Sequence, residues 1–179
     1  MNEATEDPFD LLGIEPAFDV DIAHVRSVVR RRIAACHPDR VVDPLQQEEA
    51  LRESARLNAA RAQLEDDEKR ANLLLSRLGG PSAEDDQSLP ENFLPQMMQV
   101  RMEMEEALAS GDAEAQARTR DWMRDERTRL WNAVAELFRR LQEGEDVGSQ
   151  LRCELNVWRY IERMIEQFPA EVPDAGGGR

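Results

Sequence analysis

Apolar side chains recur every three or four residues along most of this chain, and that spacing limits the possible folds more than any other feature. Such spacing places the apolar side chains on one stripe of an α-helix, which packs against a partner. Within residues 149–168 the stripe consists of Leu151, Leu155, Trp158, Ile161, Ile165 and Phe168. Because long stretches lack both glycine and proline, helices can run through them uninterrupted. The sequence therefore predicts an all-α protein.

The N-terminal half predicts a helical hairpin with a short helix on either side. The short helices are expected at residues 7–13 and 69–78, and the long helices at 22–36 and about 45–64. The inward residues of the first long helix are Ile22, Val25, Val29, Ile33 and Cys36. Those of the second are Leu51, Ser54, Leu57, Asn58, Arg61 and Leu64. Two antiparallel helices with such stripes bury them against each other.

The turn between the two long helices has the sequence Cys36-His37-Pro38-Asp39-Arg40. Proline fixes its own φ and disfavours helical geometry at the residue before it. We therefore expect the first long helix to end here. His37 and Asp39 then lie on a tight loop, where their side chains face solvent or a partner.

A basic outer face is predicted on the helix that leads into this turn. Arg26, Arg30 and Arg31 fall off its apolar stripe, and His24 lies nearby. The chain as a whole carries a net charge of -14. A local basic patch on such an acidic protein indicates a contact with an acidic partner. The alternative is an ordinary solvated face.

The C-terminal half predicts three antiparallel helices joined by short connections. These helices are expected at about 93–108, 113–141 and 149–168. Polar and acidic residues before them predict a linker, and the glycine-rich end predicts a disordered tail. The predicted division is a first domain over 1–80, a linker over 81–91, a bundle over 92–168 and a tail over 169–179.

Composition and spacing argue against several classes of function. The net charge of -14 opposes nucleic-acid binding, and no apolar run is long enough to span a membrane. Cys36 and Cys153 match no zinc or CxxC spacing, and His24 has no partner at metal-ligand spacing. His37 and Asp39 lack a nucleophile and an oxyanion site, so we predict a protein that is not an enzyme and holds no metal or other cofactor. The acidic N-terminus matches no signal or transit peptide, which predicts a cytoplasmic protein.

His-Pro-Asp between two helices, the first of them basic, resembles the signature of the J-domain co-chaperones. Residues 53–60 (Glu-Ser-Ala-Arg-Leu-Asn-Ala-Ala) and 70–75 (Arg-Ala-Asn-Leu-Leu-Leu) narrow the resemblance to the HscB family of iron-sulfur co-chaperones, over about residues 7–168. The resemblance implies an N-terminal J-domain helical hairpin followed by a C-terminal three-helix antiparallel bundle. It also implies two partners. These are a DnaK/HscA-class heat-shock chaperone, whose ATPase is stimulated, and an IscU-type iron-sulfur scaffold protein, which the bundle binds.

The resemblance assigns residues of this chain to each partner. The chaperone-binding residues are His37, Pro38, Asp39, Arg26, Arg30, Arg31 and Arg40. The scaffold-binding residues are Leu94, Met98, Gln99, Met102 and Val157. The chain departs from the family pattern at Cys36, where an aromatic residue is usual, and at Pro95, where a large apolar residue can stand. Arg32 stands where J-domains often carry leucine, which either weakens packing or shifts the apolar stripe to Ile33.

The helix expected at 93–108 carries two apolar rows. The first, which should face the bundle, is Met97, Val100, Met104 and Leu108. The second is Leu94, Met98 and Met102, rotated away from the first. A surface helix needs only one apolar stripe, and methionine suits an adaptable binding surface. The second row therefore predicts a client surface, unless it packs against the J-domain or widens the bundle core.

Two other functions stay open at this point. One is a J-domain co-chaperone for a different client. The other is a non-catalytic helical interaction protein in which the His-Pro-Asp loop has lost its role.

Overall fold

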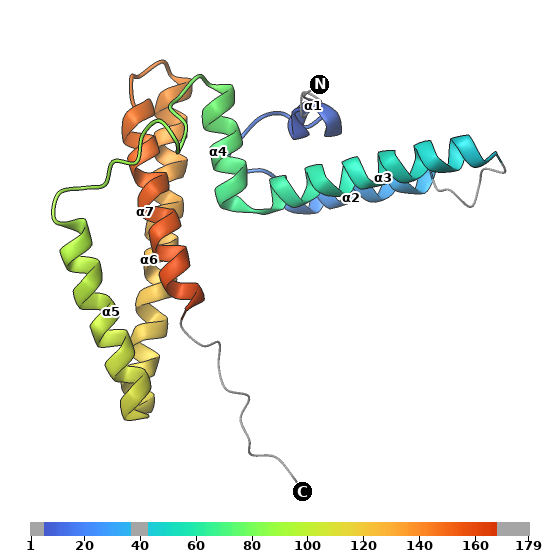
Figure 1. Cartoon of the computed structure of the whole chain (residues 1–179). Coiled ribbons are helices and arrows are strands. Elements are labelled where there is room, and N and C mark those ends of the chain that lie inside the picture. The colour runs from blue at the N-terminus through green and yellow to red at the C-terminus, as the bar shows by residue number, and fades with distance from the viewer. Residues whose placement is uncertain (1–5, 37–42, 168–179) are drawn as a thin grey trace, which may run out of the picture. The chain divides into compact units, whose positions relative to one another are not determined.

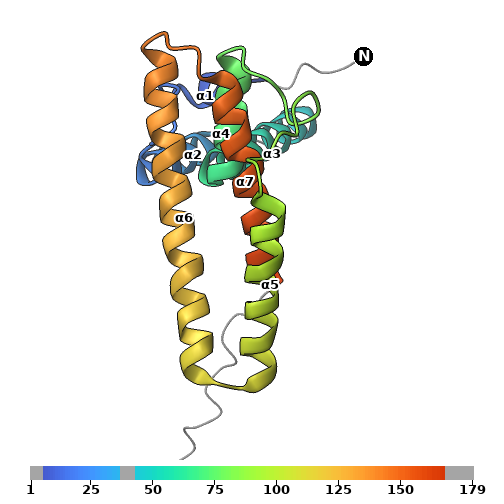
Figure 2. The same ribbon diagram turned by 90° about the vertical axis from the view of Figure 1, so that its left-hand side faces the viewer.

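The computed structural model of the chain describes residues 6–36 and 43–167. Every regular element in those two ranges is a helix (Figures 1 and 2). The helices are α1 (Pro8–Leu12), α2 (Ile22–Ala35), α3 (Pro44–Glu65), α4 (Asp67–Arg77), α5 (Phe93–Ser110), α6 (Ala113–Gln142) and α7 (Gly148–Glu166). The predicted all-α fold is confirmed.

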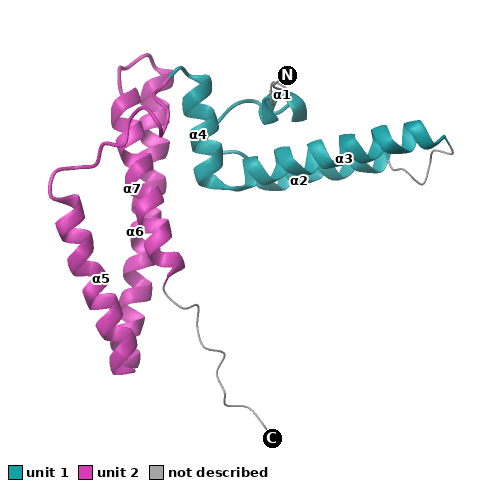
Figure 3. Cartoon of the chain, viewed as in Figure 1, with its two compact units in different colours: residues 1–79 teal, residues 80–179 magenta. Residues whose placement is uncertain are grey.

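The chain divides into two compact units, residues 1–79 and residues 80–179, which we call unit 1 and unit 2 (Figure 3). Unit 1 contains α1 to α4, and unit 2 contains α5 to α7. Each unit has its own set of buried side chains, so each is described by itself below.

Unit 1 is built around α2 and α3, which run antiparallel and side by side (Figure 1). Aspartate side chains cap both helices: Asp21 accepts from the His24 N–H at 3.0 Å, and Asp43 from the Leu45 N–H at 3.2 Å. The short helix α1 packs on both long helices. The core consists of Phe9, Leu12, Val25, Val28, Val29, Leu57, Ala60 and Leu64. Burying each large apolar side chain contributes about 2 kcal/mol, so this core holds the hairpin together.

The buried stripe of α3 differs from the predicted one. Ala50 and Leu57 are buried on it, whereas Leu51 and Asn58 are exposed. Each residue turns a helix by about 100°, so Ala50 and Leu57 share a face from which Leu51 is rotated away. The prediction that Leu51 and Asn58 face inward is therefore wrong.

Arg32 stabilises unit 1 by joining three helices. Its Nη1 donates to the carbonyl oxygen of Leu11, next to the end of α1, and its Nη2 lies 3.3 Å from Glu53 Oε1 on α3. The apolar stripe continues past it through Ile33, which is half-buried against the core. The structure therefore agrees with the expectation that the apolar stripe shifts to Ile33, and not with the expectation that Arg32 weakens packing.

Arg70 is a buried cation that ties α4 to the rest of unit 1. Its side chain donates from Nε to the Phe18 carbonyl oxygen at 2.7 Å and from Nη1 to the Leu64 carbonyl oxygen at 2.6 Å. Its Nη2 donates to the Asp67 carboxylate, and its guanidinium carbon lies 5.3 Å from the centre of the Phe18 ring. The Leu64 carbonyl lies in the last turn of α3, where no intrahelical N–H is available. Arg70 therefore satisfies the end of one helix from the start of the next.

Unit 2 is a bundle of three antiparallel helices in which α6 packs against both α5 and α7 (Figure 2). On α5, the Phe93 ring meets the Tyr160 ring of α7 edge to face, with their centres 5.3 Å apart. Farther along α5, Arg101 Nη2 donates to Gln167 Oε1 at 2.8 Å, just beyond the end of α7. Helix α7 therefore has neighbours on two sides, and this explains why more of its circumference is buried than one stripe.

Residues 81–91, predicted as a linker, lie in unit 2 and contact α7. Asn156 Nδ2 donates to the carbonyl oxygens of Asp86 at 3.1 Å and Ser88 at 3.0 Å. The Oδ1 of Asn156 accepts from Nε of Arg152, a buried arginine, at 3.0 Å. This polar chain anchors the segment that leads into α5.

Candidate partner-binding surfaces

The His-Pro-Asp motif and Arg40 lie outside the described residues. The structure shows the two helix ends on either side of them. Helix α2 ends at Ala35, where the Cys36 N–H donates to the Arg32 carbonyl oxygen at 3.2 Å. Helix α3 then begins at Pro44 behind its Asp43 cap. The Sγ of Cys36 lies 3.8 Å from Ser54 Oγ on α3, so the last residue before the motif is held against the opposite helix.

The basic face of α2, formed by Arg26, Arg30 and Arg31, is exposed to solvent as predicted from the apolar stripe. Arg30 and Arg31 form no ion pair with any residue that the structure describes. Arg26 differs, because its Nε donates to Glu65 Oε1 at 2.8 Å. Glu65 was not predicted as a partner, because the two residues lie on different helices and only the hairpin brings them together.

The second apolar row of α5, which we call the outer row, is exposed. Leu94 is 51%, Met98 67% and Met102 63% exposed. By contrast, Met97 and Met104 of the first row are buried in the bundle. The expectation that the outer row widens the bundle core is therefore wrong.

The outer row borders a shallow hollow of about 600 Å³ whose rim is acidic. Met98 and Met102 form its apolar wall. Its remaining lining residues are Pro95, Gln99, Glu103, Glu105 and Glu106. Gln99 Nε2 donates to Glu103 Oε1 at 3.0 Å, which orients the amide along the helix. An apolar strip beside several carboxylates suits a partner that offers apolar and basic side chains.

Val157 does not belong to this surface. It is 2% exposed on α7, which is inconsistent with the direct partner contact predicted for it. Tyr160, one turn further along α7, meets the Phe93 ring of α5. The neighbouring Asn156 bonds to the carbonyl oxygens of Asp86 and Ser88, so α7 is covered by more than α6 in this region.

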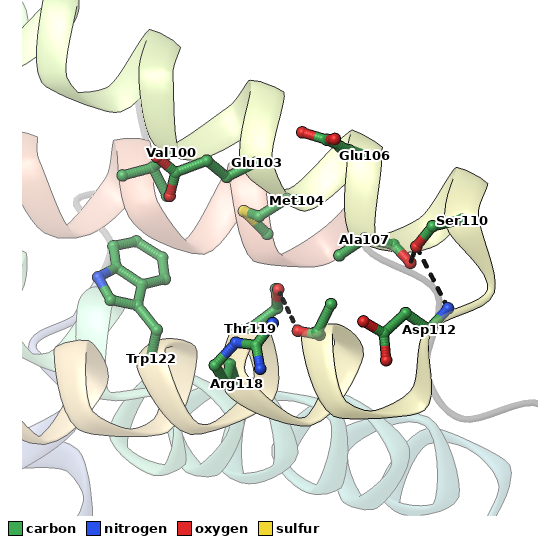
Figure 4. Close-up of a pocket in the computed structure, with 11 residues that line it drawn as sticks. Val100, Glu103, Met104, Glu106, Ala107, Ser110, Asp112, Arg118, Thr119 and Trp122 are labelled. Atoms are coloured by element: carbon green, nitrogen blue, oxygen red, sulfur yellow. Dashed lines mark hydrogen bonds between the residues drawn. The ribbon is translucent and has the colours of Figure 1, made fainter.

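A second hollow, of about 570 Å³, lies between α5 and α6 (Figure 4). Val100 and Met104 of α5 lie opposite Trp122 of α6 across it, and Ser110 and Asp112 stand at the turn between the helices. Its hydroxyl groups bond to backbone: Thr119 Oγ1 donates to the Ala115 carbonyl oxygen at 3.1 Å, and Ser110 Oγ to the Ala107 carbonyl oxygen at 3.2 Å. No hydroxyl lining it is paired with a base, so the hollow lacks an activated nucleophile.

The two cysteines lie on different units. Cys36 and Cys153 are free thiols, and no group of three or more metal-ligating side chains occurs in the part of the chain that the structure describes. Burial raises the pKa of the Cys153 thiol, which keeps it protonated and unreactive near neutral pH. Among the described helices, none is both long and apolar enough to cross a membrane.

No protein-family model matches this chain, but curated proteins similar to it are found. The "Co-chaperone protein HscB homolog" of Bordetella petrii is 29% identical over 173 residues, covering 95% of this chain and 98% of that protein. The homolog of Neisseria meningitidis serogroup A is 31% identical over 147 residues, covering 80% of this chain and 88% of that protein.

Two solved structures share the fold. Human co-chaperone protein HscB superposes with a TM-score of 0.77 at 20% identity, covering 93% of this chain and 82% of that one. The chaperone HscB from Vibrio cholerae superposes with a TM-score of 0.65 at 24% identity, covering 91% of this chain and 99% of that one.

Proposed function

The chain belongs to the HscB co-chaperone family, and we propose that it stimulates the ATPase of a DnaK/HscA-class chaperone and delivers an IscU-type iron-sulfur scaffold protein to it. The observation that carries the proposal is the His37-Pro38-Asp39 sequence between two antiparallel helices, the first with a basic outer face. We further propose that the protein acts in the cytoplasm. Its partners there would be these two proteins, without nucleic acid or membrane.

In this proposal, unit 1 recognises the chaperone by charge. Arg26, Arg30 and Arg31 attract an acidic surface of the ATPase domain, and Arg40 adds a further positive charge beside the motif. Such complementarity mainly sets the association rate and the orientation of the encounter, and salt weakens it. His37 and Asp39 are thereby brought to the polar groups at the domain junction of the chaperone.

Stimulation itself follows from differential binding. The loop must contact the hydrolysis-competent state of the chaperone better than its resting state, so that binding shifts the population towards hydrolysis. The bond that breaks lies in the chaperone's ATP, and this chain needs neither a nucleophile nor a cofactor for its part. We accordingly propose that the protein is not itself an enzyme.

Unit 2 recognises the scaffold through the outer row of α5. Leu94, Met98 and Met102 supply apolar contact area, and Gln99 supplies a polar contact beside them. The exposure of these side chains supports the proposal, because large apolar groups on a free surface favour association. Methionine adapts to the shape of its partner at small cost.

A second candidate is a co-chaperone of the same kind with another client. Pro95 favours it, because it replaces a large apolar residue that the family can carry within the scaffold patch. A helical interaction protein without any chaperone partner is the remaining possibility.

Co-purification from the native cell, followed by identification of the partners, separates these functions. Recovery of both a DnaK-class chaperone and an iron-sulfur scaffold protein is expected. Recovery of the chaperone with a different client would favour the second candidate, and recovery of no chaperone would contradict the proposal.

Charge reversal on the basic face tests the mode of docking. Arg26→Glu with Arg30→Glu should slow association with the chaperone, and the loss should shrink at high salt. Helicity should barely change, because both side chains are exposed. Unchanged binding at low salt would mean that the basic face is only solvated.

A further inference from the structure

Two arginines face one carboxylate oxygen at the end of α3. The Nε of Arg26 donates to Oε1 of Glu65 at 2.8 Å. The Nε of Arg61 lies 3.8 Å from the same oxygen, which is too far for a hydrogen bond. That nitrogen is buried and has no hydrogen-bond partner among the described residues. Arg26 therefore occupies the oxygen that Arg61 also approaches.

This arrangement bears on docking, given the function proposed above. Arg26 belongs to the basic face, yet Glu65 neutralises it in the free protein, whereas Arg30 and Arg31 have no such counter-ion among the described residues. A partner's carboxylate must compete with Glu65 for Arg26. Release of Arg26 alone would leave Glu65, which is 26% exposed, without its hydrogen-bond donor.

Arg61 offers a replacement donor. It lies one turn before Glu65 on α3, and the i, i+4 spacing allows a direct ion pair. A small side-chain movement would bring its Nε within hydrogen-bond distance of Glu65. The same movement would satisfy a nitrogen that now has no partner.

We propose that Glu65 is an internal counter-ion which Arg26 exchanges for a carboxylate of the chaperone on docking, while Arg61 takes over Glu65. Glu65 thereby slows association with acidic surfaces in general. It favours a partner that presents a carboxylate where Arg26 can reach it. Glu65 and Arg61 are positioning residues that act through Arg26, and neither needs to touch the chaperone.

Glu65→Gln tests the counter-ion, because glutamine keeps the shape of the side chain and removes its charge. Stopped-flow association with an ATP-bound DnaK-class chaperone should be about 2- to 5-fold faster at low salt, and the gain should fade as salt rises. Glu162→Gln is the matched control: Glu162 lies on α7, is 22% exposed, and pairs with Arg127 at 2.5 Å. That variant loses the same charge from unit 2 and should associate as wild type does.

Arg61→Met tests the takeover. It should weaken binding to the chaperone severalfold, whereas Arg52→Met, which removes an exposed arginine from the same helix, should change binding less. In the Glu65→Gln background Arg61→Met should have no further effect, because non-additivity reveals that the two residues act through one another. This comparison separates the exchange from a general loss of positive charge.

The results distinguish failure of the exchange from failure of the proposed function. Glu65→Gln associating no faster than Glu162→Gln, or Arg61→Met acting equally in both backgrounds, would overturn the exchange. If these results come with normal wild-type binding, the proposed function stands and only this inference fails. Absence of wild-type binding would instead overturn the proposed function. Should Glu65→Gln unfold, the comparison of Arg61→Met with Arg52→Met alone decides.

Discussion

Replacing Arg70 with methionine should destabilise unit 1. The arginine is 2% exposed, and methionine keeps an unbranched apolar stem without any donor. The Leu64 carbonyl oxygen, now bonded at 2.6 Å, would lose its donor, whereas the Phe18 carbonyl oxygen would lose the bond at 2.7 Å and keep the one from the Val20 N–H at 3.2 Å. A buried acceptor left unsatisfied costs about 1–3 kcal/mol.

The unsatisfied Leu64 carbonyl gives a loss of about 1–3 kcal/mol, and the lost bond to Phe18 and the lost contact with its ring add about 1 kcal/mol each. Relief from burying a guanidinium offsets part of this, and Asp67 can be hydrated because its side chain is 46% exposed. We expect a net loss of about 2 kcal/mol, which is a substantial share of the roughly 5–15 kcal/mol typical of a domain.

Urea unfolding with two readouts measures this loss. All three tryptophans, Trp122, Trp131 and Trp158, lie in unit 2, so their fluorescence reports that unit. Hydrogen exchange of α2 and α3 peptides reports unit 1. Arg70→Met should speed exchange in unit 1 and leave the tryptophan transition in place.

The control is Arg52→Met, which removes an exposed i, i+4 ion pair with Glu48 and should cost less than about 0.5 kcal/mol. A loss below about 1 kcal/mol for Arg70→Met would refute the reasoning, because it would mean that water replaces the arginine at both carbonyls.

Three further predictions follow from the two units. Met98→Ala with Met102→Ala should weaken scaffold binding while the melting temperature stays within a few degrees of wild type, because both side chains are exposed; a large drop in melting temperature would return them to the core. Val157→Ala should instead destabilise unit 2 by about 1–3 kcal/mol in urea unfolding, because the side chain is buried. An unchanged urea midpoint would indicate that the side chain is exposed. Hydrogen bonds from Arg77 lower the pKa of the Asp10 carboxyl. The Arg77–Asp10 pair therefore stabilises unit 1 above about pH 4, the pKa of the unfolded chain, and this stabilisation is lost as the pH falls through the lower pKa of the folded protein. Arg77→Gln should therefore differ from wild type in urea midpoint at neutral pH and converge with it in acid, and a difference that persists at pH 2 would contradict this assignment.

The sequence was sufficient for features that depend on local periodicity. The helices and the exposure of the outer row follow from the spacing of apolar residues. Pattern alone also separated Met98 from Met97, because adjacent residues on a helix differ by about 100° in direction.

Features that depend on tertiary contacts could not be predicted from the sequence. Arg32 and Arg70 look like surface residues in a helical pattern, and only the fold brings the Leu11, Phe18 and Leu64 carbonyls to them. The pairing of Glu65 with Arg26 likewise needs the hairpin register.

Val157 shows the same limit in the opposite direction. A helix with two neighbours buries two rows, and periodicity does not reveal how many neighbours a helix has. The contacts that α7 makes through Tyr160 and Asn156 join segments far apart in the sequence, so its periodicity does not predict them.

The measurement that tests the account most directly is ATP hydrolysis by a DnaK-class chaperone in a single turnover, with wild-type protein and with His37→Gln. The account predicts that wild type accelerates hydrolysis and that His37→Gln abolishes the acceleration while keeping its helicity and its binding to the scaffold protein. Because the basic face remains intact, the variant should still associate at a rate close to wild type. Full acceleration by the folded His37→Gln variant would contradict the central claim that this loop drives the chaperone towards hydrolysis.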